Sequence, residues 1–137
     1  MLAQESQFLK IGEVHQQSQV PIKTIRYYEE LGLIQSARRT RGGFRLFWPE
    51  VLTRLAFIKQ AQSLGLSLQE IGEILALHDQ GQIPCQTVRQ KFQQKIVAIN
   101  DRIEQLTQLK NQLTHLLDQA TPTTLTDEQI CPIIESH

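Results

Sequence analysis

The sequence is poor in the features on which secreted and membrane proteins depend. It holds two cysteines, Cys85 and Cys131, among 137 residues. Two thiols do not provide the disulfide framework of a small secreted domain, and in a reducing compartment we expect both to stay reduced. No apolar run approaches the roughly 18 residues of a membrane span, and residues 1–7 lack the basic and then apolar pattern of a signal peptide. These absences predict a cytoplasmic protein with no membrane partner.

The chain also lacks a net charge, because its 14 lysines and arginines balance its 14 aspartates and glutamates. Whole-chain electrostatics therefore give no indication of a nucleic-acid partner. Residues 38–54 differ from this average, because they contain a single acid, Glu50, beside five arginines. A local basic patch on a neutral protein is what contacts with backbone phosphates require, although a solvated loop with scattered arginines has the same composition. The five arginines are Arg38, Arg39, Arg41, Arg45 and Arg54.

Catalytic patterns are missing as well. The sequence contains no nucleophile elbow, no P-loop and no pair of carboxylates at a catalytic spacing. We therefore do not expect an enzyme. A chain of 137 residues has room for one small domain and an accessory element.

What is present begins with a candidate helix-turn-helix. Apolar residues at near-helical spacing predict a first helix over residues 8–18. Pro21 suits the first turn of a second helix over residues 21–30, where its missing N–H costs nothing. Gly32 suits the C-terminal cap of that helix. Two short helices joined by a tight turn are typical of a helix-turn-helix.

Three further elements follow. Residues 36–47 contain the turn signal Arg41-Gly42-Gly43 and then alternate apolar and basic residues, which predicts a small β-hairpin or wing. Residues 49–65 predict a helix. Ser67 and Glu70 form a capping box that opens another helix, which continues to about residue 77.

A long heptad pattern follows a break at residues 81–84. Apolar residues recur at heptad spacings over residues 87–119, with Lys110 at the one polar position of the seam. Such a helix is roughly 50 Å long and cannot bury its seam against a domain of this size. The pattern predicts a homodimer, and the alternative is a single helix packed within the monomer. The seam residues are Phe92, Ile96, Ile99, Ile103, Leu106, Leu113 and Leu117.

The second helix carries side chains suited to DNA. Lys23, Arg26 and Tyr27 lie on one side of it, opposite Ile22 and Ile25. Arginine binds a guanine edge or a phosphate, and threonine and tyrosine hydroxyls suit phosphate oxygens. The Arg-Tyr-Tyr run also fits plain packing, and we expect one of its two tyrosines to be mostly structural. In the hairpin, Arg45 and Phe47 share a face that suits a flanking groove or backbone contact. The candidate DNA-binding residues are Lys23, Thr24, Arg26, Tyr27 and Arg45.

In their order and spacing these motifs resemble the MerR family of bacterial transcription regulators over about residues 9–77. The resemblance implies a mainly α fold, in which a winged helix-turn-helix domain precedes an antiparallel coiled coil that makes a homodimer. It implies that the protein binds a pseudo-palindromic promoter and distorts it when an effector binds, so that RNA polymerase engages. Phe47 stands where the family commonly has tyrosine. The matching motifs are Ile11-Gly12-Glu13-Val14, Val20-Pro21, Thr24-Ile25-Arg26-Tyr27-Tyr28-Glu29, Leu31-Gly32-Leu33, Arg39, Gly43-Phe44-Arg45-Leu46-Phe47, Leu64-Gly65-Leu66-Ser67-Leu68 and Ile71.

The resemblance also suggests how the chain is divided and what the effector is. It implies a DNA-binding domain at residues 1–78, a linker and dimerisation helix at 79–119 and an effector loop at 120–137. In an antiparallel dimer, Cys85 of one subunit approaches Cys131 of the other, and two converging thiolates suit a soft metal ion. Residues 130–134 resemble the tail of the family's metal sensors. A cysteine at the start of the long helix resembles members that answer zinc, cadmium, lead or mercury.

One departure from the metal sensors is that they carry another cysteine where this chain has Thr121. Zinc takes about four ligands, so further donors are needed if zinc binds. The candidates are His137, Asp127, Glu128 and His78. Three alternatives stay open: a two-coordinate mercury site, thiol redox sensing, and an unrelated or absent effector. Cys85 alone also fits the role of a small buried apolar residue. A metal-buffering protein is the alternative from another functional class.

Overall fold

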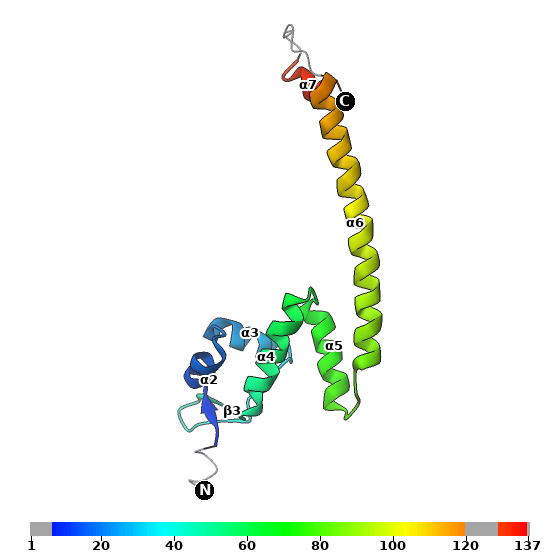
Figure 1. The fold of residues 1–137 in the computed structure, drawn as a ribbon. Helices are drawn as coiled ribbons and strands as arrows, with labels where there is room; N and C mark the ends of the chain where they lie inside the picture. The colour runs from blue at the N-terminus through cyan, green and yellow to red at the C-terminus, as the bar shows by residue number, and fades with distance from the viewer. Residues whose placement is uncertain (1–6, 120–128, 137) are drawn as a thin grey trace. The chain divides into compact units, whose positions relative to one another are not determined.

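The computed structural model describes residues 7–119 and 129–136. The chain divides after Cys85 into two units, Met1–Cys85 and Gln86–His137 (Figure 1). The predicted mainly helical fold with a helix-turn-helix, a wing and a long helix is confirmed. In the first unit the elements are β1 (Leu9–Lys10), α2 (Ile11–Ser18), α3 (Ile22–Glu30), β2 (Arg38–Arg39), β3 (Arg45–Phe47), α4 (Glu50–Ser63) and α5 (Leu68–Asp79).

The sheet contains a strand that the sequence did not predict. The first helix, expected over residues 8–18, begins only at Ile11, because Leu9 and Lys10 form β1 and pair antiparallel with Phe47 and Leu46 of β3. The strand order is β1-β3-β2. The apolar residue Leu9, which suggested a longer helix, lies instead in a strand that pairs with a segment far along the chain.

The second helix begins and ends close to the predicted residues. Pro21 occupies the N-cap of α3 with φ −58° and ψ 146°, one position before the helix rather than within its first turn. At the other end Gly32 adopts a φ of +78°, in the left-handed region that glycine enters without strain. There the Leu33 amide donates to the Tyr28 carbonyl at 2.9 Å. These two caps limit α3 to a short, rigid helix.

The hydrophobic core of the first unit joins the helix-turn-helix to α4 and α5. Side chains from every layer are buried, and the largest are fully so: Phe47, Ile25, Ile34, Leu55, Ile58, Ile71, Ile74 and Val14. The capping box at Ser67 is confirmed, because the Glu70 amide donates to Ser67 Oγ at 3.1 Å and the Ser67 amide donates to Glu70 Oε1 at 3.0 Å. The core therefore supports α3 from behind.

The last two helices are α6 (Cys85–Gln119), which belongs to the second unit from its second residue on, and the short α7 (Pro132–Glu135), coloured from green to red in Figure 1. The 35-residue α6 begins two residues before the predicted start, and none of its residues is buried. Its predicted seam is exposed, for example at Ile103 (55%) and Leu113 (53%). No helix among the described residues is both long and apolar enough to cross a membrane. The long helix thus has an apolar stripe without a covering partner in the described part of the chain.

Candidate DNA-binding interface and cysteine positions

The two faces predicted for α3 are present in the structure. Ile25 is fully buried and Tyr28 is 7% exposed, so that these side chains face the core. Lys23, Arg26 and Tyr27 are exposed on the other face, Tyr27 to 49%. Thr24 is half-buried at the margin between the two faces. An exposed face with two cations and a phenol, fixed to a rigid core, is suited to a phosphate backbone and base edges.

Tyr28 is the structural member of the tyrosine pair. Its hydroxyl donates to Gln62 Oε1 on α4 at 3.1 Å. Burial raises the pKa of Tyr28, while the hydrogen bond with Gln62 lowers it, and the result is above the ordinary value. Because this hydroxyl is engaged on α4, Tyr27 is the tyrosine that presents its ring and hydroxyl to solvent.

The wing between β2 and β3 is closed by its backbone. The Thr40 amide donates to the Phe44 carbonyl at 2.8 Å, and the Phe44 amide donates to Thr40 Oγ1 at 3.1 Å. Gly43 has a φ of +84°, which explains the glycine at the turn. Arg39 donates from Nη1 to the Gly43 carbonyl at 3.1 Å. Arg41 at the tip is exposed, and Phe44 is 69% exposed.

The shared face expected for Arg45 and Phe47 is wrong as a DNA-contacting surface. Phe47 is completely buried, and its strand packs against α2. Arg45 is half-buried, and its Nε donates to Glu29 Oε1 near the end of α3. Of these two wing residues, only Arg45 is therefore accessible for a contact with DNA. The glutamate partner carried no local sequence signal, because 16 residues separate the pair.

Arg54 is a structural residue rather than an open part of the basic patch. Its Nε donates to the Leu33 carbonyl, and its two terminal amino groups donate to the Asp79 carboxylate at 2.6 and 2.8 Å. The hydrogen bond from Arg54 lowers the pKa of Asp79, which burial opposes and the charges of Arg54 and His78 support. Arg54 thus connects the segment after α3 with the end of α5.

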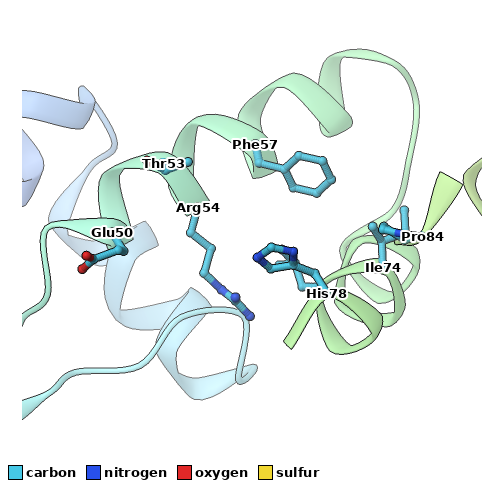
Figure 2. Close-up of a pocket in the computed structure, with 8 residues that line it drawn as sticks. Glu50, Thr53, Arg54, Phe57, Ile74, His78 and Pro84 are labelled. Carbon is cyan, nitrogen blue, oxygen red and sulfur yellow. The ribbon is translucent and has the colours of Figure 1, made fainter. Parts of the chain in front are cut away.

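A cavity of about 370 Å³ lies beside Arg54, between α4 and α5. Figure 2 shows Arg54 and His78 extending into the space between the two helices, with Phe57 and Ile74 on its walls. His78, a candidate metal ligand from the sequence, therefore lies in this cavity. Among the described residues, no group of three or more histidines, cysteines, aspartates or glutamates is arranged to hold a metal ion.

The two cysteines lie at opposite ends of the second half of the chain. Cys85 is the first residue of α6 and is exposed, and Cys131 is the half-buried N-cap of α7; both are free thiols. The 35 residues of α6 span about 50 Å. The roughly 12 residues from the end of α6 to Cys131 reach at most about 40 Å when fully extended. Cys85 and Cys131 of the same chain therefore cannot meet while α6 is intact.

The other predicted donors, Asp127, Glu128 and His137, lie outside the described residues, as does Thr121. Apart from His78, the candidate metal ligands that the structure describes are therefore the two thiols. Thiolate sulfur suits soft ions, and two thiolates fall short of the roughly four ligands that zinc takes.

Comparisons with known proteins identify the family to which this fold belongs. Residues 9–77 match the family described as "MerR HTH family regulatory protein", and residues 52–116 match "MerR, DNA binding". The chain is 36% identical over 127 residues to a mercuric resistance operon regulatory protein of Bacillus cereus, covering 93% of this chain and 95% of that protein. It is 35% identical over 128 residues to the transcriptional regulator ZntR of Escherichia coli (strain K12), with coverages of 93% and 90%.

A solved structure extends the likeness along almost the whole chain. The transcription regulator PbrR691 from Ralstonia metallidurans CH34, crystallised in complex with lead(II), superposes with a TM-score of 0.78 at 28% sequence identity. The match covers 93% of this chain and 98% of that chain. The resemblance read from the motifs is thereby confirmed, and with it the expectation of a regulator rather than an enzyme. The chain belongs to the MerR family of helix-turn-helix transcription regulators.

Proposed function

We propose that this protein is a cytoplasmic homodimer that binds double-stranded promoter DNA and distorts it for RNA polymerase in response to a soft or divalent metal ion. The exposed face of α3 carries the DNA-binding part of this proposal. Lys23, Arg26 and Tyr27 stand on a helix whose opposite face is fixed in the core. A rigid support of this kind sets the distance between the side chains and the groove.

Each side chain of the interface has a role that its chemistry suits. Arg26 reads a guanine edge or binds a phosphate, since its guanidinium offers two parallel donors. Lys23 and the hydroxyls of Thr24 and Tyr27 bind phosphate oxygens. Arg45 binds the backbone beside the half-site from the wing.

The dimer follows from α6. Its seam is apolar at heptad spacing and exposed in the single chain, with Ile96 56% and Ile103 55% exposed. A second copy covers such a stripe in a coiled coil. Two copies related by two-fold symmetry present two α3 helices, which suits a pseudo-palindromic site.

The metal part of the proposal rests on the donor set and on the relatives. One relative is named for mercuric resistance, and one solved structure contains lead(II). Because Cys85 and Cys131 of one chain cannot meet, we assign them to sites shared by the two subunits. Two thiolates suit a thiophilic ion, whereas zinc would also need donors such as Asp127 and His137. A bound ion would link the two subunits, so that metal binding could change how the subunits are arranged.

The DNA-binding proposal is tested by Arg26→Ala in the full-length dimer, against a duplex that the wild-type protein selects from a random library. We expect the loss of about 1–3 kcal/mol of specific binding, with a smaller loss on random duplex. Arg102→Ala on α6 removes the same charge from an exposed site and is the matched control. An unchanged footprint for Arg26→Ala would contradict the assignment.

The metal proposal is tested by titrating the purified dimer with Hg(II), Pb(II), Cd(II), Zn(II) and Cu(I) while thiolate-to-metal absorbance is recorded. Cys85→Ser and Cys131→Ser should each abolish binding and metal-dependent transcription. A normal response from either single variant contradicts a site that needs both. Transcription that answers an oxidant but no metal supports thiol redox sensing, and metal binding without duplex selectivity supports metal buffering.

A further inference from the structure

The carboxylate of Glu29 joins two segments that the sequence keeps apart. Glu29 is the penultimate residue of α3, and its Oε1 accepts the hydrogen bond from Arg45 Nε on β3. Hydrogen bonding with Ser36, in the connection from α3 to the wing, also lowers the pKa of this carboxyl. The side chains of Arg45 and Glu29 are 28% and 18% exposed. One carboxylate thus connects the end of α3 to the wing.

This carboxylate is held in its charged form. Burial alone would raise the pKa of Glu29, but the hydrogen bonds with Ser36 and Arg45 and the Arg45 charge hold it below its ordinary value. A hydrogen bond between two ionised groups is shorter and stronger than one between neutral groups. Partial burial also protects the pair from screening by salt.

The pairing directs the remaining donors of Arg45. A guanidinium is planar, and its N–H groups form a rigid fork. With Nε on Glu29, the orientation of the plane is set, and within the described part of the chain the two terminal amino groups of Arg45 make no hydrogen bond. Glu29 follows Arg26 by three residues and the buried Ile25 by four, so it lies at the margin between the exposed and the buried face of α3. Arg45 is therefore held at the margin of the face that carries Arg26.

We propose that Glu29 is a positioning residue, which orients Arg45 toward a DNA phosphate and sets the wing relative to α3 so that both contact one half-site together. The inference rests on the proposed DNA-binding function and adds to it a residue that never touches DNA. Without the pairing, Arg45 is a mobile cation that still attracts DNA but no longer does so at a fixed place. Glu29 thus favours specific binding while it lowers the free positive charge.

A double-mutant cycle in the full-length dimer tests the inference. Glu29→Ala, Arg45→Ala and the double variant are compared on the duplex selected by the wild-type protein and on random duplex, at several salt concentrations. Glu30→Ala removes the same charge from the next, exposed residue of α3 and is the matched control. Glu29→Gln keeps an acceptor for Arg45, and thermal unfolding shows whether each variant is folded.

We expect Glu29→Ala to weaken binding to the selected duplex about tenfold, the scale of a lost charge-assisted contact, and not to weaken binding to random duplex. In the Arg45→Ala background, Glu29→Ala should cause no further loss. Glu29→Gln should recover part of the affinity, whereas Glu30→Ala should leave the preference for the selected duplex unchanged.

Two results would overturn the proposal. If the losses from Glu29→Ala and Arg45→Ala multiply in the double variant, Glu29 does not act through Arg45. If Glu29→Ala strengthens binding to both duplexes equally, as Glu30→Ala would by removing a repulsive charge, Glu29 has no positioning role. A wild-type dimer that selects no sequence at all is a different result, because it contradicts the proposed function itself.

Discussion

The two units of this chain differ in what they bury. In the first unit, side chains from the sheet and from α2 to α5 pack against one another, and eight apolar side chains are almost completely inaccessible to solvent. In α6, which the structure describes throughout, no residue is buried, although apolar residues recur at heptad spacing. The first unit is therefore a complete packing arrangement within one chain, and α6 is half of one. On the proposed function, each copy carries one DNA-reading helix, whereas the coiled coil and the shared metal sites need two copies.

The largest effect should come from opening the core of the first unit. Phe47→Ala removes a fully buried ring from β3, and we expect it to lower the free energy of unfolding by about 3–5 kcal/mol. Phe44→Ala, three residues earlier at 69% exposure, is the control and should change that free energy by less than about 0.5 kcal/mol. Urea denaturation measures both. Equal losses would show that β3 is not packed as described.

The next effect should come from the seam of α6. Ile103→Glu places a charge where we expect the second copy, so the dimer should dissociate and operator affinity should fall at least about a hundredfold as the two half-sites separate. Val97→Glu, at 61% exposure on the same helix but off the seam, should leave the dimer intact. Light scattering with size exclusion reports the oligomeric state. An Ile103→Glu dimer of wild-type stability would contradict the heptad interpretation.

The smallest effect concerns acid stability, and it belongs to the first unit. Glu29 and Asp79 have pKa values below their ordinary ones, so each stabilises the folded state above its unfolded-state pKa of about 4. This stabilisation is lost as pH falls through the lower, folded-state values. Unfolding free energy should therefore be level from about pH 7 to 5 and decline below about pH 4. Glu29→Gln combined with Asp79→Asn should flatten the decline, and a double variant with an unchanged acid slope would remove these residues from the explanation.

Local patterns predicted the elements that local physics determines. The caps at Gly32 and Ser67 and the two faces of α3 depend on residues a few positions apart, and each was readable in the sequence. The heptad pattern likewise gave α6, with a start two residues late.

Most of the features that were missed depend on residues far apart in the chain. Leu9 was placed in a helix because its pairing partner Phe47 lies on a distant strand. Burial of Phe47 depends on the packing of β3 against α2, which lies far from it in the sequence. The acid partners of Arg45 and Arg54 lie 16 and 25 residues away, so their pairing leaves no local signal. The short α7 carried no periodicity long enough to detect.

The most direct test of the account is the metal content of mixed dimers that combine one Cys85→Ser chain with one Cys131→Ser chain. If the sites are shared between subunits, the mixed dimer keeps one intact pair of cysteines and should bind about half the Hg(II) of the wild-type dimer, whose two-fold symmetry gives it two sites. Each variant homodimer should bind none. A mixed dimer without bound metal, or a variant homodimer that binds as the wild type does, would contradict a site built from two copies.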